Sequence, residues 1–573
     1  MLAGVPKNLH WALQEFRRFT MPSLCARSNK VPLLWVDGLC IDQDDEKEKS
    51  SQVNLMGSIY RSAFTTISWV GRDNGRISTA IKWLDLISRE LSEPWGEYSP
   101  NGVMWMQKYP ALFQDDRPVE NEIWGCVMEL FDLPYWTRVW IVQEIALARN
   151  VYVVCGAAAI DYLRFEEVAK WVAALSTNPD LQRPGFMGPN MWNFVAYHLA
   201  SAVTGIMVAS RCGQIAKAEE DQHDDKWNKW KCITSTVNHK ATNPRDKIYA
   251  LFGLFQTRSI ADYRKPTEDV YYGFIEELFA ETGSIEFVAF AGLRFRQESF
   301  DLPTWIPNWG ELSHHEGSQF PVNVFHADRG LKDFELVEAF IGEHRILHAS
   351  GTICGKIEKV QPWPLGGIKS FMEWCREYAS VQNMRYIIGI PRLQAAFRLC
   401  LMDGDVYEQD RAYEEPYPDS THRIVLGFLE LMRECGETNR SEFYESLGID
   451  AKHFAKSYSE RIFGLTEVQG ARIWARGDDW LPSAKFLVKR AITRNLCQTM
   501  IHMTDGYIGW GPTGTLPSDL VAVVNGCSLP LILRKVDSRY EVVGGCFLLG
   551  LMNGEVVQRM KERRDTLQEL QLQ

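Results

Sequence analysis

The sequence predicts an α/β N-terminal domain with a parallel sheet and flanking helices, a mainly helical middle and a C-terminal module with β structure. Short apolar runs typical of buried strands alternate in the first part with stretches whose apolar residues recur at helical spacing. The last part instead holds short β-rich runs separated by glycine and proline, as in a small barrel or meander. We therefore expect domains at 1–158, 159–340 and 341–555, with a charged tail at 556–573.

The expected elements of the N-terminal domain follow one another in alternation. Leu33 to Val36 is wholly apolar, which suits a strand buried on both faces. Asp44 and Asp45 then open a helix, because negative charge suits a helix N-terminus. Further helices are expected at 8–19, 79–91, 120–132 and around 134–146, and further strands at 64–70 and 151–156.

Composition narrows the classes of function. The net charge of −11 over 573 residues argues against nucleic-acid binding, which needs a basic surface. The chain shows no apolar run of the roughly 20 residues that a membrane helix needs and no signal-peptide pattern. Its thirteen cysteines include no CxxC pair, which indicates reduced thiols in the cytoplasm.

A group of polar residues directly follows the first expected strand. Asp37, Cys40, Asp42 and Gln43 lie there, and Glu46 is spaced to share the inward face of the next helix. Ligands bind at the carboxyl ends of strands in open α/β sheets, so these residues are candidates for substrate binding or for supporting the loop. Cys40 is expected to be a small buried residue rather than a nucleophile, because no histidine in the same motif would activate it.

The same stretch resembles the central motif of the fungal heterokaryon incompatibility (HET) domain. The matching residues are Trp35-Val36-Asp37, Cys40-Ile41, Gln43, Glu46, Gln52-Val53, Met56, Ile59-Tyr60 and Ala63. Family members usually carry one more strand before the first helix, and this chain begins too late to hold it. The resemblance therefore implies a sheet that lacks its first strand.

Two later blocks extend the resemblance. Residues 134–146 resemble the last segment of the HET domain, and residues 243–254 resemble the block that follows it, with Asn243 in place of the family's aspartate. Arg245 and Asp246 in that block are expected to form a structural ion pair that clamps a helix onto the HET domain. An anion-binding role for them is the alternative.

Glu144 is the candidate catalytic residue. On a helix it would share the aromatic, buried face of Trp136 and Trp140, and a buried carboxylate needs a hydrogen-bond partner. In the structural interpretation, Glu144 accepts hydrogen bonds from Arg138 or a neighbouring loop. Trp140-x-x-Gln143-Glu144 is distantly similar to a segment of TIR domains, in some of which a glutamate takes part in cleaving NAD. That similarity implies a TIR-like fold, with Glu144 stabilising the positive charge that develops on the ribose. Trp140 is a further candidate for substrate binding or loop support.

Other site classes find less support. Residues 509–514 match GxGxxG, but Pro512 and Pro517 leave no room for the helix that a dinucleotide fingerprint requires, so we expect a turn. The histidines and cysteines show no zinc-type spacing, so no metal site is predicted. No cofactor is implied, and NAD enters only as a substrate.

The resemblance implies a protein of self/non-self recognition whose HET domain triggers cell death. NAD hydrolysis, switched on by self-association, is one mechanism. The alternative is a non-enzymatic module that docks to itself or to another fungal signalling protein, and a third interpretation is an inactive, shortened family member. The sequence leaves the trigger, the partner and the oligomeric state open.

Overall fold

The computed structural model describes twenty segments of the chain, which form two compact units, Met1–Leu278 and Phe279–Gln573. The boundary between the units falls inside helix α14 (Thr267–Thr282). The described segments are 7–20, 33–92, 104–113, 116–118, 120–177, 183–220, 227–255, 257–295, 301–312, 325–334, 338–362, 367–380, 385–402, 419–436, 439–447, 484–485, 488–489, 491–492, 498–562 and 565–573.

A small mixed sheet lies in the first unit, in the order β1 (Thr66–Trp69), β2 (Val151–Cys155) and β3 (Ala158–Asp161). Strands β1 and β2 run parallel with Ile67 opposite Tyr152, and β3 returns antiparallel to β2. The alternation of buried and partly buried residues along β1 follows from the two-residue period of a strand. The strands expected at 64–70 and 151–156 are confirmed, and this part of the chain mixes helices with a sheet.

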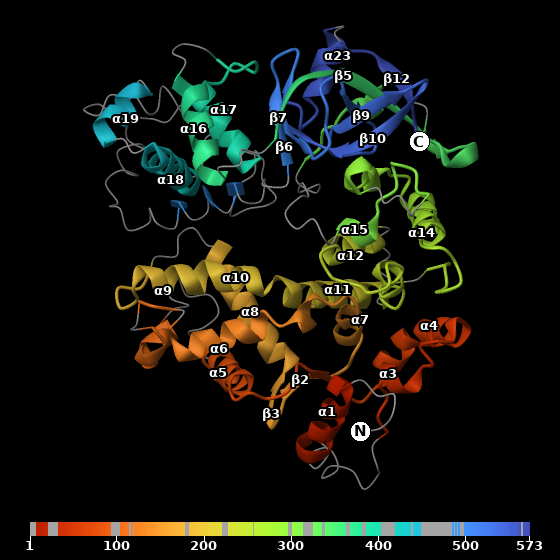
Figure 1. Cartoon of the computed structure of the whole chain (residues 1–573), viewed down its shortest axis with the longest axis vertical. Coiled ribbons are helices and arrows are strands. Elements are labelled where there is room, and N and C mark those ends of the chain that lie inside the picture. The colour runs from red at the N-terminus through yellow and green to blue at the C-terminus, as the bar shows by residue number, and fades with distance from the viewer. Residues whose placement is uncertain are drawn as a thin grey trace. The chain divides into compact units, whose positions relative to one another are not determined.

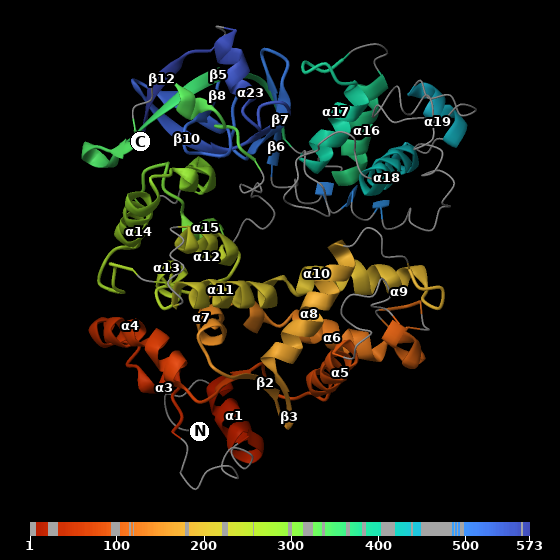
Figure 2. The ribbon, with the colours of Figure 1, turned by 180° about the vertical axis from the view of Figure 1, so that it is seen from behind.

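Helices surround this sheet where the sequence predicts them. The segments expected at 8–19, 79–91 and 120–132 fold as α1 (Lys7–Glu15) with a following π-helical turn, α5 (Arg76–Leu91) and α6 (Glu122–Phe131). Helix α5 packs against α6 and α8 (Tyr162–Thr177), and the three lie side by side in Figures 1 and 2. From residue 64 to residue 156, the chain thus has the expected kinds of element in the expected order.

Helix α4 (Glu46–Ser62) begins where the acidic residues predict. The carboxylate of Asp45 accepts hydrogen bonds from the amides of Lys47 and Glu48, at 2.8 and 3.1 Å, and so satisfies two of the unpaired N–H groups at the start of the helix. Val53 and Met56 are buried, but Glu46 is exposed at the first turn. The expectation that Glu46 faces inward is therefore wrong, because the first turn extends beyond the surface that the helix covers.

The strand predicted at Leu33–Val36 is wrong. No described strand pairs with this segment, the Leu33 side chain is fully exposed and Leu34 is 48% exposed. The backbone turns into the short helix α3 (Asp37–Cys40), and Trp35 contacts the ring of Tyr60 edge-on at 5.9 Å between centroids. An apolar run marks a segment that can be buried, but a strand also needs a pairing neighbour, which the described chain does not supply here.

The helix expected around 134–146 is divided into two parts. Pro134–Thr137 forms a 3₁₀ turn and α7 begins at Trp140 and ends at Ala146. The remaining helices of the first unit agree with the expected helical middle. They are α9 (Pro189–Asn193), the π-helical turn Phe194–His198, α10 (Leu199–Ala202), α11 (Thr204–Glu220), α12 (Asn228–Thr236) and α13 (Asp246–Tyr249).

A closed β-barrel forms the centre of the second unit (Figure 1). Strand β5 pairs with β12 on one side and with β8 on the other, and the ring continues through β10 and β9. The far half of β5 pairs instead with β6, which leads to β7 and β11. The strands are β4 (Phe340–Ile341), β5 (Leu347–Pro362), β6 (Gln498–Met503), β7 (Ile508–Pro512), β8 (Leu520–Val524), β9 (Leu531–Val536), β10 (Arg539–Gly545), β11 (Phe547–Leu548) and β12 (Leu567–Leu572).

Glycine allows β5 to serve both halves of this sheet. A Cβ at Gly351 would approach the carbonyl oxygen of Val523 and a methyl group of Leu570 to 2.8 Å. Gly355 has a φ of +155° and lies where the register with β8 shifts, which bends the strand. Gly509 and Gly511 lie inside β7, so the GxGxxG match belongs to a strand and its turn, as expected.

The other helical elements of the second unit are short 3₁₀ turns and a group of α-helices. Part of the region 368–470, expected to be mainly helical, lies outside the described residues. The elements are the 3₁₀ turns Glu286–Phe290, Leu293–Phe295, Leu331–Asp333 and Glu343–Arg345, and α15 (Trp309–Leu312), α16 (Gly367–Ser380), α17 (Arg392–Leu401), α18 (Asp419–Cys435), α19 (Arg440–Ser446) and α23 (Glu555–Lys561).

The last residues do not form the expected charged tail. Strand β12 inserts between β5 and β10, and the side chains of Leu570 and Leu572 are fully buried. The amide of Gln573 donates to the carbonyl of Tyr540 at 2.9 Å, and the Gln573 carbonyl accepts from the amide of Thr304 at 3.0 Å. Leu570 and Leu572 have the two-residue spacing of a strand, and the count of charges in this segment concealed that signal.

Candidate functional site

Glu144 lies on α7, and hydrogen bonds of the preceding turn fix where this helix begins. The Trp136 indole is buried in the 3₁₀ turn and donates to the carbonyl of Leu130 at 2.8 Å. The amide of Val139 donates to the carbonyl of Lys240 at 3.0 Å, which holds the start of α7 against a later segment. Ile141, Val142 and Ile145 are buried on the inner side of the helix, whereas Glu144 is only partly buried.

The Glu144 carboxyl has one long hydrogen bond. The phenol of Tyr135 donates to its Oε2 at 3.4 Å, and the described chain places no lysine or arginine within ion-pair distance. Burial raises the pKa of Glu144 to about 7, because desolvation disfavours the charged form. The Arg138 charge opposes this rise in the pKa, and the negative charge of Asp37 adds to it.

Two tyrosines stand beside Glu144. Burial raises the pKa of both the Tyr60 and the Tyr135 phenols well above the ordinary value, and the negative charge of Glu144 raises it further. The Ser68 hydroxyl on β1 lies next to the Tyr135 phenol. The site therefore combines one titratable carboxyl with neutral hydroxyl groups that can donate hydrogen bonds.

The loop after Trp35 presents Asp37 to this site and is held by its own polar residues. The side-chain amide of Gln43 donates to the backbone carbonyl of Asp37 at 3.2 Å. The Asp42 carboxylate accepts from the Asp44 amide at 3.0 Å, and the Asp42 amide donates to Glu48 at 3.1 Å. Asp42 and Gln43 thus make hydrogen bonds within the loop, and the roles expected of them, substrate binding or loop support, stay predictions.

Cys40 and Glu46 do not join the group around Glu144. Cys40 is exposed and its sulfur accepts from the Val36 amide at 3.5 Å, so the expectation of a buried cysteine is wrong. Its helix α3 is a single turn that covers no core, which explains the exposure. Glu46 is the first residue of α4, whereas Tyr60 lies near the end of that helix. The negative charge of Glu46 helps to raise the pKa of Arg264.

Trp140 points to Asp246 rather than to Glu144. Its indole N–H donates to Asp246 Oδ2 at 3.1 Å, and the phenol of Tyr263 donates to Oδ1 at 2.5 Å. Burial raises the pKa of Asp246, and the charge of the adjacent Arg245 opposes that rise through space. The hydrogen bonds that hold Asp246 thus come from Trp140 and Tyr263, and the role predicted for the Arg245–Asp246 pair stays a prediction.

The block that contains Asp246 packs on the helices that carry the site. The guanidinium of Arg61, on α4, donates to the carbonyl of Gly253 at 2.8 Å. Asn54, also on α4, exchanges two hydrogen bonds with the backbone of Ala261, at 2.9 and 3.0 Å. A Cβ at Gly253 would overlap the side-chain amide of Gln143 on α7, so a larger residue there would force that buried side chain to move.

Sequence reasoning missed three residues of the site, Tyr60, Ser68 and Tyr135, and considered Arg138 only as a structural partner of Glu144. Tyr60 has the pattern of an ordinary apolar position of α4, and Tyr135 breaks no local rule. Only the fold brings the four together. Among the described residues, no group of three or more histidine, cysteine, aspartate or glutamate side chains is placed to hold a metal ion, and no helix is long and apolar enough to cross a membrane.

Comparisons with known proteins agree with the motifs. Residues 2–144 match the family described as heterokaryon incompatibility protein (HET), and residues 473–567 match the Het-6 β-barrel domain. Heterokaryon incompatibility protein 6, OR allele, of Neurospora crassa is 22% identical, over 98% of this chain and 87% of that protein. No solved structure matches the chain. The HET match ends at Glu144, and the barrel match includes β6 to β11 but not β5. The chain therefore carries one segment that is similar to the HET family and another that is similar to the Het-6 β-barrel domain.

Proposed function

We propose that this protein acts in heterokaryon incompatibility and that its HET domain signals cell death by hydrolysing the nicotinamide–ribose bond of NAD. The two family matches and the Neurospora relative support the first part. The observation that supports the second part is the state of Glu144, a partly exposed carboxyl with one long hydrogen bond, two phenols beside it and no ion pair in the described chain.

The proposed reaction uses the charge of Glu144. Nicotinamide leaves with the electron pair of the glycosidic bond and becomes neutral, so positive charge develops on the ribose. The ionised carboxylate stabilises that charge, and Tyr60 and Tyr135 donate hydrogen bonds to ribose hydroxyls or water. Water then adds to the ribose carbon and releases a proton, so the products are nicotinamide, ADP-ribose and a proton. In this scheme the domain has a TIR-like active site.

Exposed leucines favour a second candidate function, docking without catalysis. Leu33 is fully exposed, and Leu34 and Leu39 are 48% and 47% exposed, all within or beside the central motif. Apolar side chains gathered on a surface are typical of protein interaction sites. In this alternative the HET domain signals by binding itself or a partner, and Asp37, Asp42 and Gln43 only hold the loop.

Expression in a fungal host separates the two. Catalysis predicts that Glu144→Gln abolishes cell death and preserves cellular NAD, while Leu33→Ser/Leu34→Ser weakens death only as far as association aids catalysis. Docking predicts the reverse: death persists in the Glu144 variant, NAD does not fall before death, and the leucine variant is silent. Protein levels of each variant need to match the wild type.

A further inference from the structure

Two exposed cations lie side by side next to the Glu144 site. Arg138 and Lys240 are opposite each other in a short parallel β-bridge, and the bond from the Val139 amide to the Lys240 carbonyl fixes the two backbones. Residues opposite each other in such a bridge project their side chains to the same side of the strands. Both side chains are exposed, so the guanidinium and the ammonium share one surface.

Arg138 faces the site. Its positive charge lowers the pKa of Glu144, Tyr60 and Tyr135 against the rise that burial causes, so it lies within electrostatic reach of all three groups. The fixed backbone of the bridge keeps Lys240 beside it.

Neither cation is held in an ion pair with a described residue. Within the described ranges, neither side chain has a hydrogen bond or an ion pair, although the chain carries 73 acidic residues against 62 lysines and arginines. Many other cations of the first unit are paired, such as Lys108 with Glu90, Arg164 with Asp85 and Lys229 with Glu277. Two neighbouring exposed cations without a close partner among the described residues are available to bind an anion.

The chemistry of the pair suits a pyrophosphate. A guanidinium donates two parallel hydrogen bonds to a phosphate, and an ammonium adds a compact positive charge. Two adjacent cations therefore match two linked phosphates, while Glu144 with its phenols matches the uncharged ribose and the departing cationic ring. A dinucleotide places these chemical groups in that same order.

We propose that Arg138 and Lys240 bind the pyrophosphate of the substrate, so that the site selects a pyrophosphate-bearing dinucleotide over a nucleoside. This inference rests on the proposed function and assigns its substrate class to two residues. Lys240 lies beyond the HET match at 2–144, so recognition uses the segment that follows the HET domain as well as the domain itself.

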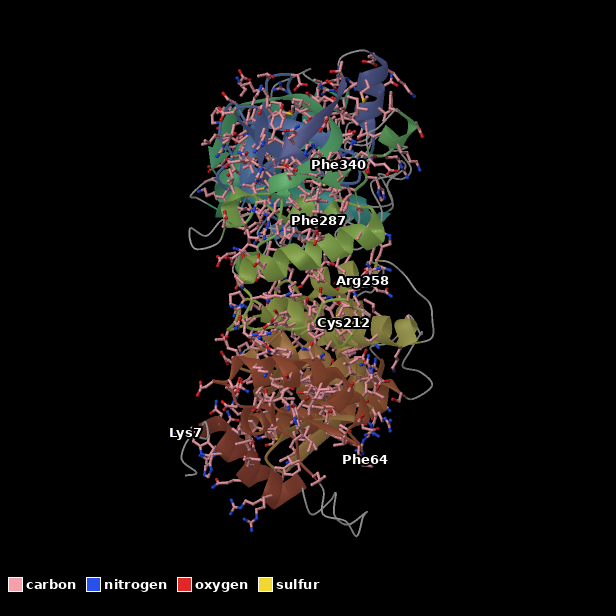
Figure 3. The ribbon with its side chains drawn as sticks, turned by 90° about the vertical axis from the view of Figure 1, so that its right-hand side faces the viewer. Lys7, Phe64, Cys212, Arg258, Phe287 and Phe340 are labelled. Atoms are coloured by element: carbon pink, nitrogen blue, oxygen red, sulfur yellow. The ribbon has the colours of Figure 1, made fainter. Side chains whose placement is uncertain are left out.

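The test measures binding of ADP-ribose, which carries the pyrophosphate and cannot turn over, to the full-length chain by titration calorimetry. The variants are Arg138→Gln/Lys240→Gln and the charge-matched control Lys82→Gln/Arg258→Gln, whose residues are also exposed in the first unit (Arg258 is labelled in Figure 3). Inorganic pyrophosphate serves as competitor, and nicotinamide riboside as the substrate without a pyrophosphate.

We expect ADP-ribose affinity to fall at least about tenfold in the Arg138/Lys240 variant, because each charge-assisted contact to phosphate is strong. The control should bind as the wild type does, and pyrophosphate should compete. Unchanged affinity in the Arg138/Lys240 variant, or no binding of ADP-ribose to any folded form, would overturn the inference.

A separate outcome concerns the proposed function alone. If ADP-ribose binds through the pair in the wild type and in Glu144→Gln, but NAD is not cleaved by any form, the pyrophosphate site stands and NAD hydrolysis fails. If NAD is cleaved and neither its KM nor ADP-ribose affinity depends on Arg138 and Lys240, hydrolysis stands and the pair is not the pyrophosphate site. Matching circular dichroism spectra exclude unfolding as the cause of either result.

Discussion

Glu144 is held in a setting that disfavours its own charge. A structural carboxylate is normally neutralised by several hydrogen bonds or an ion pair, whereas the described partner of Glu144 is a single phenol at 3.4 Å. Carboxyl groups with strongly raised pKa values are concentrated at functional sites, where the cost in stability is retained for chemistry. The loss in the free energy of unfolding that the Glu144 charge causes should therefore be measurable.

Glu144→Gln should stabilise the protein at pH 8. The folded-state pKa of about 7 lies above the ordinary value of 4.5, so the folded protein binds the proton more tightly than the unfolded chain does. Wild-type stability then falls as pH rises from about 4.5 to 7, and the neutral amide avoids that loss. We expect a gain of about 1–2 kcal/mol at pH 8 and little difference at pH 5, because the site is partly open to water.

Urea unfolding at pH 5 and pH 8 measures this difference, with Glu122→Gln as an exposed control on α6. A glutamine variant that is less stable than the wild type at pH 8 would show that Glu144 is a well-paired structural group. In that case the functional role assigned to it would lose its physical basis.

Sequence reasoning reached the catalytic candidate but not the tyrosines beside it. Glu144 could be selected because a carboxylate at the spacing of buried tryptophans conflicts with ordinary packing. Tyr60 and Tyr135 could not, because α4 and the 134–140 segment meet only in the folded chain and neither residue breaks a local rule. Trp140 was a candidate for substrate binding or loop support, and in the fold its indole N–H donates to Asp246.

Among the elements, α4 carries Tyr60 and depends on its cap. Asp45→Ala should cost about 1 kcal/mol, because two amides at the helix start lose their acceptor. Asp44→Ala removes the same charge one residue earlier, and its carboxylate makes neither of these two bonds. Chemical denaturation of the two variants side by side should rank them in this order. Equal stability would mean that the cap does not hold α4.

The close packing of Gly253 against α7 can also be tested by substitution. Gly253→Ala should destabilise the protein by about 1–3 kcal/mol, because the added methyl group overlaps the buried Gln143 side-chain amide and crowds Leu147, the residue that follows α7. Gly273→Ala on α14 is the matched control, since nothing lies within 4 Å of its added Cβ and alanine favours a helix. Thermal unfolding compares them, and a Gly253 variant as stable as the control would contradict the close packing described.

The predicted elements succeeded where the local pattern alone decides and failed where pairing decides. Helices α4, α5 and α6 follow from apolar spacing, and α4 and α6 also have the side-chain caps Asp45 and Asn121. The strand at 33–36 and the tail at 556–573 failed in opposite directions. The first has the composition of a strand but no described pairing partner, and the second has the composition of a tail but fills a place between β5 and β10.

At the scale of the whole molecule, the chain forms two units, each with its own sheet and core, and the candidate site belongs to the first. The barrel could be expected from glycine-separated β runs, but its closure could not, because β5 and β12 are about 200 residues apart in sequence. The exposed Phe64, labelled in Figure 3, belongs to the first unit, whereas Trp510 is fully buried in the second.

Trp510→Ala should loosen the barrel and leave the site intact. Removal of this fully buried indole, which donates to the Leu399 carbonyl at 2.9 Å, should cost about 3–5 kcal/mol in the second unit. Hydrogen exchange followed by mass spectrometry should show faster exchange in peptides of 498–562 and little change in 120–177. Equal acceleration in both would indicate one cooperative unit.

The account depends most on Glu144 as a working carboxylate, and nicotinamide release from NAD by the purified full-length protein tests this directly. The measurement compares wild type, Glu144→Gln and Glu122→Gln at high protein concentration from pH 6 to 8.5. We predict turnover that rises through pH 7 as Glu144 ionises, persists in the Glu122 variant and is lost in the Glu144 variant. Turnover that survives Glu144→Gln, or its absence from every folded and self-associated form, would contradict the account.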